Sequence, residues 1–162
     1  MESQADEPIE FAVGRLLTAK NKTLAVAESC TGGLITHRLT NVPGSSTYLV
    51  AGVIAYAYQA KVNALGVSWD TLNAHGAVSE ETARAMARGV RERFSTDLGL
   101  AITGIAGPGG GTPDKPVGLT YIALVTAQEE IVQRHVWQKS RVENKESSAQ
   151  AALQLLAEHL SR

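Results

Sequence analysis

Segments with the periodicity of a helix alternate with short apolar runs typical of buried strands along most of this chain. The predicted helices cover 8–19, 32–39, 59–66, 68–76, 79–94 and 149–160. The predicted strands cover 23–28, 51–58, 97–104, 117–127 and 130–138. The last two strands meet across Gln128-Glu129, which predicts a hairpin. Alternation with one late hairpin predicts a layered α/β domain with a mixed sheet, and the length of 162 residues predicts one domain, 1–162.

Composition narrows the class of partner. Hydrophobic residues make up 44% and charged residues 19% of the chain, as in ordinary globular proteins. The formal net charge is -1 and no long basic run exists, which argues against nucleic acid or a membrane surface as the main partner. The single cysteine, Cys30, excludes an internal disulfide, and no zinc-like spacing predicts a metal site. The first residues lack the pattern of a signal peptide, so we expect a cytoplasmic protein.

Polar or glycine-rich segments follow three of the predicted strands. In open α/β sheets, ligands bind beyond the carboxyl ends of the strands, so three parallel strands would bring these segments to one edge. The first contributes "AESCTGG", the second "YAYQAK", and the third the loop 104–116, which is rich in glycine. The candidate side chains at this edge are Ser29, Cys30, Thr31, Tyr56, Tyr58, Lys61 and Thr103.

A serine needs a base to act as a nucleophile, and no histidine is an obvious candidate. A lysine with a lowered pKa can serve instead, and backbone N–H groups of the loop or of the helix after Thr31 can hold an oxyanion or a phosphate. Simpler interpretations stand beside this one: Ser29 as a helix cap, Cys30 as a small buried side chain, and Lys61 as a solvated charge. Tyr56 would then be a half-buried strand residue and the loop a long turn. The residues alone predict a composite anion-binding site, with Ser/Lys hydrolysis as one use of it.

The motifs "AESCTGG", "AYAYQAK" and "AITGIAGPGGGTPDKPVG", in this order, resemble the CinA C-terminal domain family, whose stand-alone members include nicotinamide-nucleotide amidohydrolases. The resemblance covers about 9–160. It implies a compact three-layer α/β/α domain that needs no metal or other cofactor. It further implies hydrolysis of nicotinamide mononucleotide (NMN) to nicotinate mononucleotide and ammonia, in pyridine nucleotide recycling, by a protein that self-associates, most simply as a dimer.

The resemblance also implies roles for individual residues. Ser29 matches the family's nucleophile and Lys61 its general base, while Tyr56 would orient Lys61 or relay its proton, and Thr103 matches a hydroxyl residue of the catalytic set. Backbone amides around the first turn or in the glycine-rich loop would hold the oxyanion, and an arginine would hold the phosphate. The substrate-binding residues expected on this basis are Cys30, Thr31, Gly32, Gly33, Gly104, Gly107, Gly109, Gly110 and Arg141.

Four residues depart from the family pattern. Tyr58 stands where the family often has asparagine. Lys139 and Ser140 replace a Gly-Asp pair before Arg141, and Lys145 replaces a second arginine, which keeps the charge but loses the bidentate fork. A catalytically silent module that binds a mononucleotide, as a sensor or through a partner, is therefore the second hypothesis.

Overall fold

The computed structural model describes residues 7–162; the first six residues, part of the segment that lacks a signal-peptide pattern, lie outside the described residues. Its elements, in order, are α1 (Ile9–Lys20), β1 (Leu24–Glu28), α2 (Leu34–Thr40), the 3-10 helix η2 (Ser45–Thr47), β2 (Leu49–Ile54), α3 (Tyr58–Leu65), α4 (Trp69–His75), α5 (Glu80–Phe94), β3 (Leu98–Gly104), β4 (Leu119–Val125), β5 (Glu130–Val136) and α6 (Arg141–Leu160). None of the helices within 7–162 is long and apolar enough to cross a bilayer.

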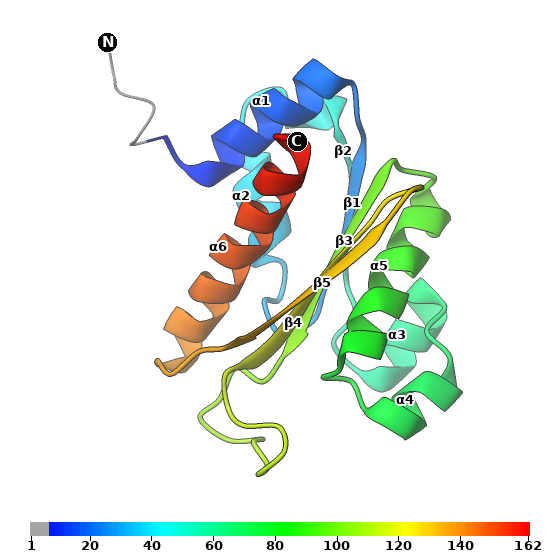
Figure 1. Ribbon diagram of the computed structural model, residues 1–162, viewed down its shortest axis with the longest axis vertical. Coiled ribbons are helices and arrows are strands. Elements are labelled where there is room, and N and C mark those ends of the chain that lie inside the picture. The colour runs from blue at the N-terminus through cyan, green and yellow to red at the C-terminus, as the bar shows by residue number, and fades with distance from the viewer. Residues whose placement is uncertain (1–6) are drawn as a thin grey trace.

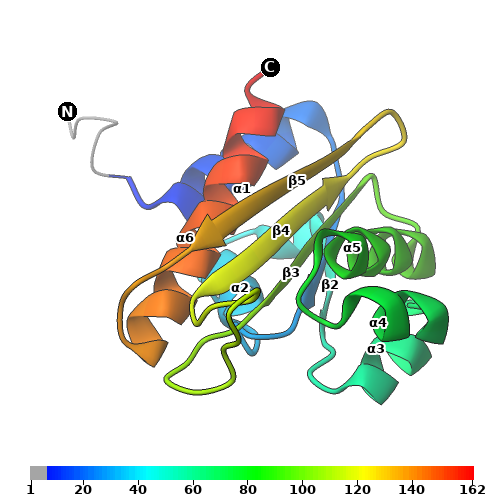
Figure 2. The same cartoon turned by 60° about the horizontal axis from the view of Figure 1, so that its bottom comes forward.

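The five strands form one sheet in the order β2-β1-β3-β4-β5. β1 pairs in parallel with β2 and β3, whereas β4 is antiparallel to β3 and β5. Helices α1, α2 and α6 cover one face, and α3, α4 and α5 cover the other (Figures 1 and 2). The three-layer α/β/α domain with a mixed sheet is therefore confirmed.

The strand order places a topological switch point between β1 and β3. The chain leaves β1 through α2 on one face to reach β2 at the edge, and then returns through α3, α4 and α5 on the other face to β3. Crossovers that diverge in this way leave a crevice at the carboxyl ends of the two strands. The turn after β1 and the loop after β3 begin at this crevice, as the sequence predicts.

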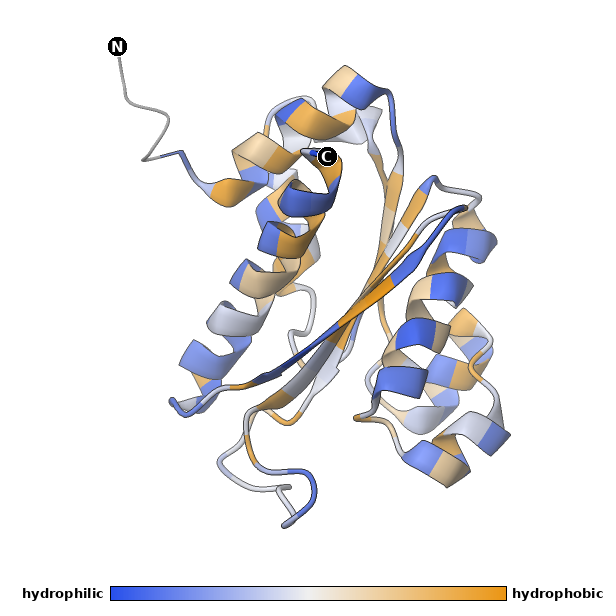
Figure 3. Ribbon diagram, in the orientation of Figure 1, coloured by the Kyte–Doolittle hydropathy of each residue, from blue (hydrophilic) through white to orange (hydrophobic). Residues whose placement is uncertain are grey.

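The core is divided by the sheet into two halves. All five residues of β1 are buried, and their side chains alternate between the halves. Ala25 and Ala27 pack under α5, whereas Leu24 and Val26 pack under α1 and α6. Figure 3 shows apolar residues interspersed with hydrophilic ones along α5 and α6, the pattern of helices with one face on a sheet. In α5, Ser79 caps the first turn by accepting from the Thr82 N–H, as predicted.

Two boundaries differ from the sequence predictions by more than two residues. β2 ends at Ile54 rather than 58, because the next two carbonyl groups, of Ala55 and Tyr56, accept hydrogen bonds from the Lys61 amine. α6 begins at Arg141 rather than 149, because Ser140 caps it by accepting from the Glu143 N–H. Its first two turns carry few apolar residues, so the hydrophobic stripe that reveals a helix in a sequence is missing there.

The structure makes a stability prediction at Tyr48. This side chain is 3% exposed, and its hydroxyl has no hydrogen-bond partner among the described residues. It lies against α1, where a Cβ added to Gly14 would meet the hydroxyl oxygen at 2.4 Å. Replacing Tyr48 by Phe removes an unsatisfied buried polar group, so we expect Tyr48→Phe to raise the free energy of unfolding by about 1 kcal/mol.

Urea denaturation of the wild type and the variant measures this change. Gly14→Ala should be destabilising, and less so when combined with Tyr48→Phe, because the nearest atom in the clash is then gone. A loss of stability in Tyr48→Phe would contradict the account.

Candidate active site

Ser29 is the first residue after β1, at the switch point. Its backbone N–H donates to the Ile102 carbonyl of β3 (3.1 Å), which continues the parallel ladder by one bond beyond the strand. Its side chain is nearly fully buried and points toward α3. Ser29 is therefore fixed by the sheet and is not the cap of α2, whose N-cap position is occupied by Gly33.

The side chain of Lys61, on α3, contacts the side chain of Ser29. Its amine lies 3.0 Å from Ser29 Oγ, 2.8 Å from the Ala55 carbonyl oxygen and 3.0 Å from the Tyr56 carbonyl oxygen. Lys61 is 1% exposed, so the interpretation as a solvated surface charge is wrong. The three acceptors match the three donors of an ammonium group.

Burial lowers the pKa of Lys61 to about 8, against a smaller opposing effect of the Cys30 thiol. When the amine loses one proton it keeps two donors for the carbonyls of Ala55 and Tyr56, and its lone pair is left facing Ser29 Oγ. The lowered pKa makes this neutral form more accessible near neutral pH than for an exposed lysine. The arrangement is that of a nucleophile with an oriented general base.

Glu28, the last residue of β1, holds the turn from the opposite face of the sheet. Its fully buried carboxylate accepts from the Thr31 hydroxyl (2.6 Å), the Ile35 N–H (3.0 Å), and the N–H (2.9 Å) and hydroxyl (2.7 Å) of Thr36. The N–H groups of Ile35 and Thr36 in the first turn of α2 are thus already engaged by a carboxylate, whereas the ligand contacts predicted for residues 30–33 stay a prediction. The signal in the sequence was an acidic residue ending an apolar strand that leads directly into a helix.

Other backbone donors of this edge remain available. The N–H groups of Cys30 and Thr31 have no acceptor within the part of the chain that the structure describes, whereas the Gly32 N–H donates to the Ser29 carbonyl. At the end of β3, Ile105 donates to Leu119, so by the alternation of antiparallel pairs the preceding Gly104 N–H points away from β4 and toward the end of β1. A side chain on Gly104 would also lie 3.2 Å from the Cys30 sulfur. These N–H groups suit a developing oxyanion.

The hydroxyl groups of the other two predicted catalytic residues bond to groups other than Ser29 and Lys61, although Thr103 lies beside Ser29 on the neighbouring strand. Thr103 is buried and donates its hydroxyl to the Ala77 carbonyl (2.8 Å) in the loop between α4 and α5. Tyr56 is not a half-buried strand residue: its side chain is 60% exposed, and its hydroxyl accepts from Arg141 (3.3 Å). Tyr56 contacts Lys61 through its backbone carbonyl. The catalytic roles of Tyr56 and Thr103 stay a prediction.

Residues of α6 hold the glycine-rich loop against this edge. Arg141 donates to the Gly107 carbonyl (2.7 Å), and Asn144, which sequence reasoning missed, donates to the Ala106 carbonyl (2.9 Å). Gly109 and Gly110 lie in the exposed outer part of the loop, away from these contacts. Gly107 contributes its carbonyl to the Arg141 contact, and Lys145, one turn beyond Arg141 on α6, acts electrostatically on the Cys30 thiol.

Comparison with known proteins shows to which family the chain belongs. The model of the CinA C-terminal domain matches residues 6–160. This chain belongs to the CinA C-terminal domain family. Its relatives include a putative competence-damage inducible protein of Moorella thermoacetica, 52% identical over 151 residues, which are 93% of this chain and 36% of that protein. A CinA-like protein of Syntrophus aciditrophicus is 52% identical over 157 residues, 96% of this chain and 37% of its own length.

Solved structures of CinA superfamily proteins have the same fold. The competence/damage inducible protein CihA of Agrobacterium tumefaciens superposes with a TM-score of 0.90 at 36% identity, covering 99% of both chains. A CinA superfamily protein of Klebsiella pneumoniae gives a TM-score of 0.91 at 31% identity, covering 94% of this chain and 96% of its own. This chain therefore spans nearly the whole length of these solved chains, but well under half of the length of the two relatives named above.

Cys30 gives a test of this geometry. The thiol is buried on the α6 side of the sheet, and burial raises its pKa to about 12, which agrees with a small core side chain and not with a nucleophile. We therefore expect Cys30 to resist alkylation by iodoacetamide at pH 8 in the folded protein and to react fully in 6 M guanidinium chloride.

Mass spectrometry of the intact protein counts the added groups, and the single cysteine makes the result unambiguous. Rapid alkylation of the folded protein would contradict the buried environment. It would also make Cys30 a competing nucleophile to Ser29.

Proposed function

We propose that the chain is an amidohydrolase that uses Ser29 and Lys61 to convert NMN to nicotinate mononucleotide and ammonia without a metal, in pyridine nucleotide recycling. The observation that supports this is the contact of 3.0 Å between the Lys61 amine and Ser29 Oγ, in a site where burial lowers the pKa of the lysine to about 8. Family membership supports the same chemistry, since the matching motifs carry the family's serine, lysine, tyrosine and threonine.

The first half of the reaction forms an ester. Neutral Lys61 removes the Ser29 proton as Oγ attacks the carboxamide carbon, and the N–H groups of Cys30 and Gly104 stabilise the oxyanion. Lys61 then returns its proton to the amide nitrogen. The C–N bond breaks, ammonia leaves, and the nicotinoyl group stays bound to Ser29 as an ester.

The second half reverses these roles with water. Lys61 takes a proton from a water molecule, the resulting hydroxide attacks the ester carbon, and the proton returns to Ser29 as the C–O bond to the enzyme breaks. Nicotinate mononucleotide is released. The carbonyls of Ala55 and Tyr56 keep the Lys61 amine directed at the reacting atoms in both halves.

Basic side chains of α6 favour a phosphorylated substrate. Arg141 uses part of its guanidinium on Gly107 and Tyr56, and its remaining donors are available for a phosphate. Lys145 projects one turn further along α6 from the same side of the helix. The carboxylate of Glu28 is enclosed by four donors, so its charge is already compensated where a nucleotide would enter.

Ammonia release from NMN, measured with EDTA present, tests the proposal. Wild-type protein should release ammonia, and Ser29→Ala should lower the rate at least a thousandfold because no other nucleophile is positioned there. Ser46 is an exposed serine that precedes the amino end of β2. The variant Ser46→Ala is therefore the matched control and should keep full activity.

The alternative hypothesis, a catalytically silent mononucleotide-binding module, is favoured by the engagement of Arg141 with Gly107 and Tyr56. No ammonia from the wild type, together with a higher melting temperature in the presence of NMN, would support it and exclude the hydrolase.

The pH profile tests the role of Lys61. The neutral amine is the active form, so kcat/KM for NMN should rise about tenfold per pH unit below pH 8 and level off above it. Lys61→Arg, which stays charged, should lose activity at every pH. Lys22 is an exposed lysine that precedes the amino end of β1, and Lys22→Ala is the control. A flat profile from pH 6 to 9 would exclude Lys61 as the base.

A further inference from the structure

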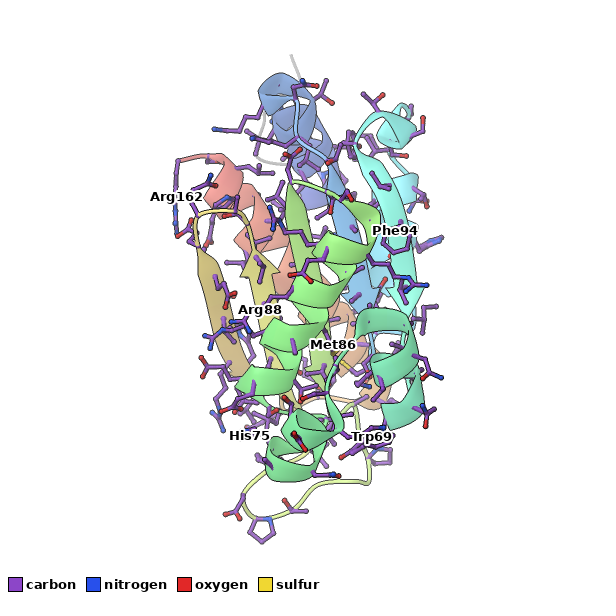
Figure 4. The ribbon with its side chains drawn as sticks, turned by 90° about the vertical axis from the view of Figure 1, so that its right-hand side faces the viewer. Trp69, His75, Met86, Arg88, Phe94 and Arg162 are labelled. Carbon is purple, nitrogen blue, oxygen red and sulfur yellow. The ribbon has the colours of Figure 1, made fainter. Side chains whose placement is uncertain are left out.

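Exposed aromatic side chains gather near the Ser29–Lys61 pair. Among the described residues, the large aromatic side chains that are exposed are those of Tyr56, Tyr58 and Trp69, at 60%, 43% and 43%. Tyr56 follows β2, and Tyr58 and Trp69 open α3 and α4. Figure 4 shows Trp69 at the lower end of the molecule and Phe94 at the far end of α5. A cluster of exposed aromatic residues on one edge indicates a binding surface.

Tyr58 is held next to the site through the backbone of Ala77. It precedes Lys61 by three residues on α3, so the two side chains leave the helix on the same side. Its hydroxyl accepts from the Ala77 N–H (3.2 Å), and the Ala77 carbonyl accepts from the Thr103 hydroxyl (2.8 Å). Through this loop Tyr58 is tied to the end of β3, the strand that flanks Ser29.

Trp69 extends the surface that Tyr58 begins. The two ring centroids lie 6.4 Å apart with their planes tilted by 40°. Trp69 is fixed at the first turn of α4, which Ser68 caps by accepting from the Thr71 N–H. The pair forms an aromatic wall of two rings, still open to solvent, on the α3–α4 side of the site.

The basic residues of the site bear on which ligand the aromatic wall of Tyr58 and Trp69 would bind. Lys61, Arg141 and Lys145 are all basic, and the only carboxylate described at the turn, Glu28, is enclosed on the other face of the sheet. A substrate with a positively charged ring needs compensation for the repulsion by these groups. The electron-rich faces of Tyr58 and Trp69 supply it, because a cation over an aromatic face is attracted by the ring quadrupole.

We propose that Tyr58 and Trp69 form a cation–π subsite that makes the enzyme select a positively charged, N-substituted pyridinium carboxamide over a neutral aromatic carboxamide of the same shape. The inference rests on the proposed function, since it places the reacting ring within reach of Ser29. It adds a determinant of specificity from α3 and α4, separate from the phosphate contacts of α6.

Two nucleotides test the subsite. One is NMN, and the other is its benzamide C-nucleotide, which keeps the carboxamide, ribose and phosphate but has a neutral ring. Calorimetry on Ser29→Ala, which holds substrate without turnover, measures both affinities. We expect NMN to bind about 2- to 30-fold more tightly than the neutral analogue. Trp69→Leu or Tyr58→Leu, each added to Ser29→Ala, should bring the ratio of the two affinities close to one, because each weakens the binding of NMN and not that of the neutral analogue.

Matched variants separate the ring from the structure around it. Tyr58→Phe loses the Ala77 bond but keeps an aromatic face, and Trp69→Phe also keeps a ring, so both should retain discrimination. Phe94→Leu, at the distant end of α5, should leave the ratio unchanged. Thermal unfolding of each variant checks that it is folded, and the independent substitutions at two positions cover the failure of either one.

Equal affinity of Ser29→Ala for the two nucleotides, no binding of either, or a ratio that survives both leucine variants would overturn the subsite. These outcomes are read from binding and not from turnover. Ammonia release from NMN by the wild type alongside equal affinities would leave the amidohydrolase standing without the subsite. Discrimination between the two nucleotides without ammonia release would leave the subsite standing without the amidohydrolase.

Discussion

A lysine amine buried where two parallel strands end is the constraint around which the candidate site is organised. A charged or neutral amine in the interior needs a partner for every donor, and Lys61 finds three: two carbonyls released from the end of β2 and the hydroxyl of Ser29. This requirement ends β2 at Ile54, because the two carbonyls that follow the strand accept from the amine. The same burial lowers the pKa of the lysine, so one structural demand produces both the shape and the reactivity of the site.

The alternation of side chains along β1 keeps the acid and the base of this edge apart. Glu28 and Ser29 are adjacent in sequence, but successive residues of an extended strand face opposite sides of the sheet. The carboxylate therefore meets the start of α2, while the serine meets Lys61 of α3. A carboxylate beside Lys61 would stabilise the ammonium form and raise its pKa. The separation allows Glu28 to stabilise the turn without raising the pKa of Lys61.

Backbone, more than side chains, forms the rest of this edge. The carbonyls of Ala55 and Tyr56, the N–H groups of Cys30 and Gly104, and the loop carbonyls held by α6 all depend on the path of the chain. A chain that is only 31% identical still superposes with a TM-score of 0.91. The backbone that carries the site therefore tolerates extensive side-chain change elsewhere in the chain.

The sequence by itself determined the order of helices and strands and the capped limits of α5, because periodicity and caps are local signals. From the sequence, a shared edge required that the three strands run parallel, and the pairing of Ser29 with Lys61 was implied by the family resemblance. The sequence did not show that Lys61 is buried, that Glu28 holds α2, or that Thr103 and Tyr56 bond to Ala77 and Arg141. Nor did it locate the end of β2 or the start of α6. Only the tertiary structure decided these, since burial and hydrogen-bond partners depend on residues that the fold brings together from distant parts of the chain.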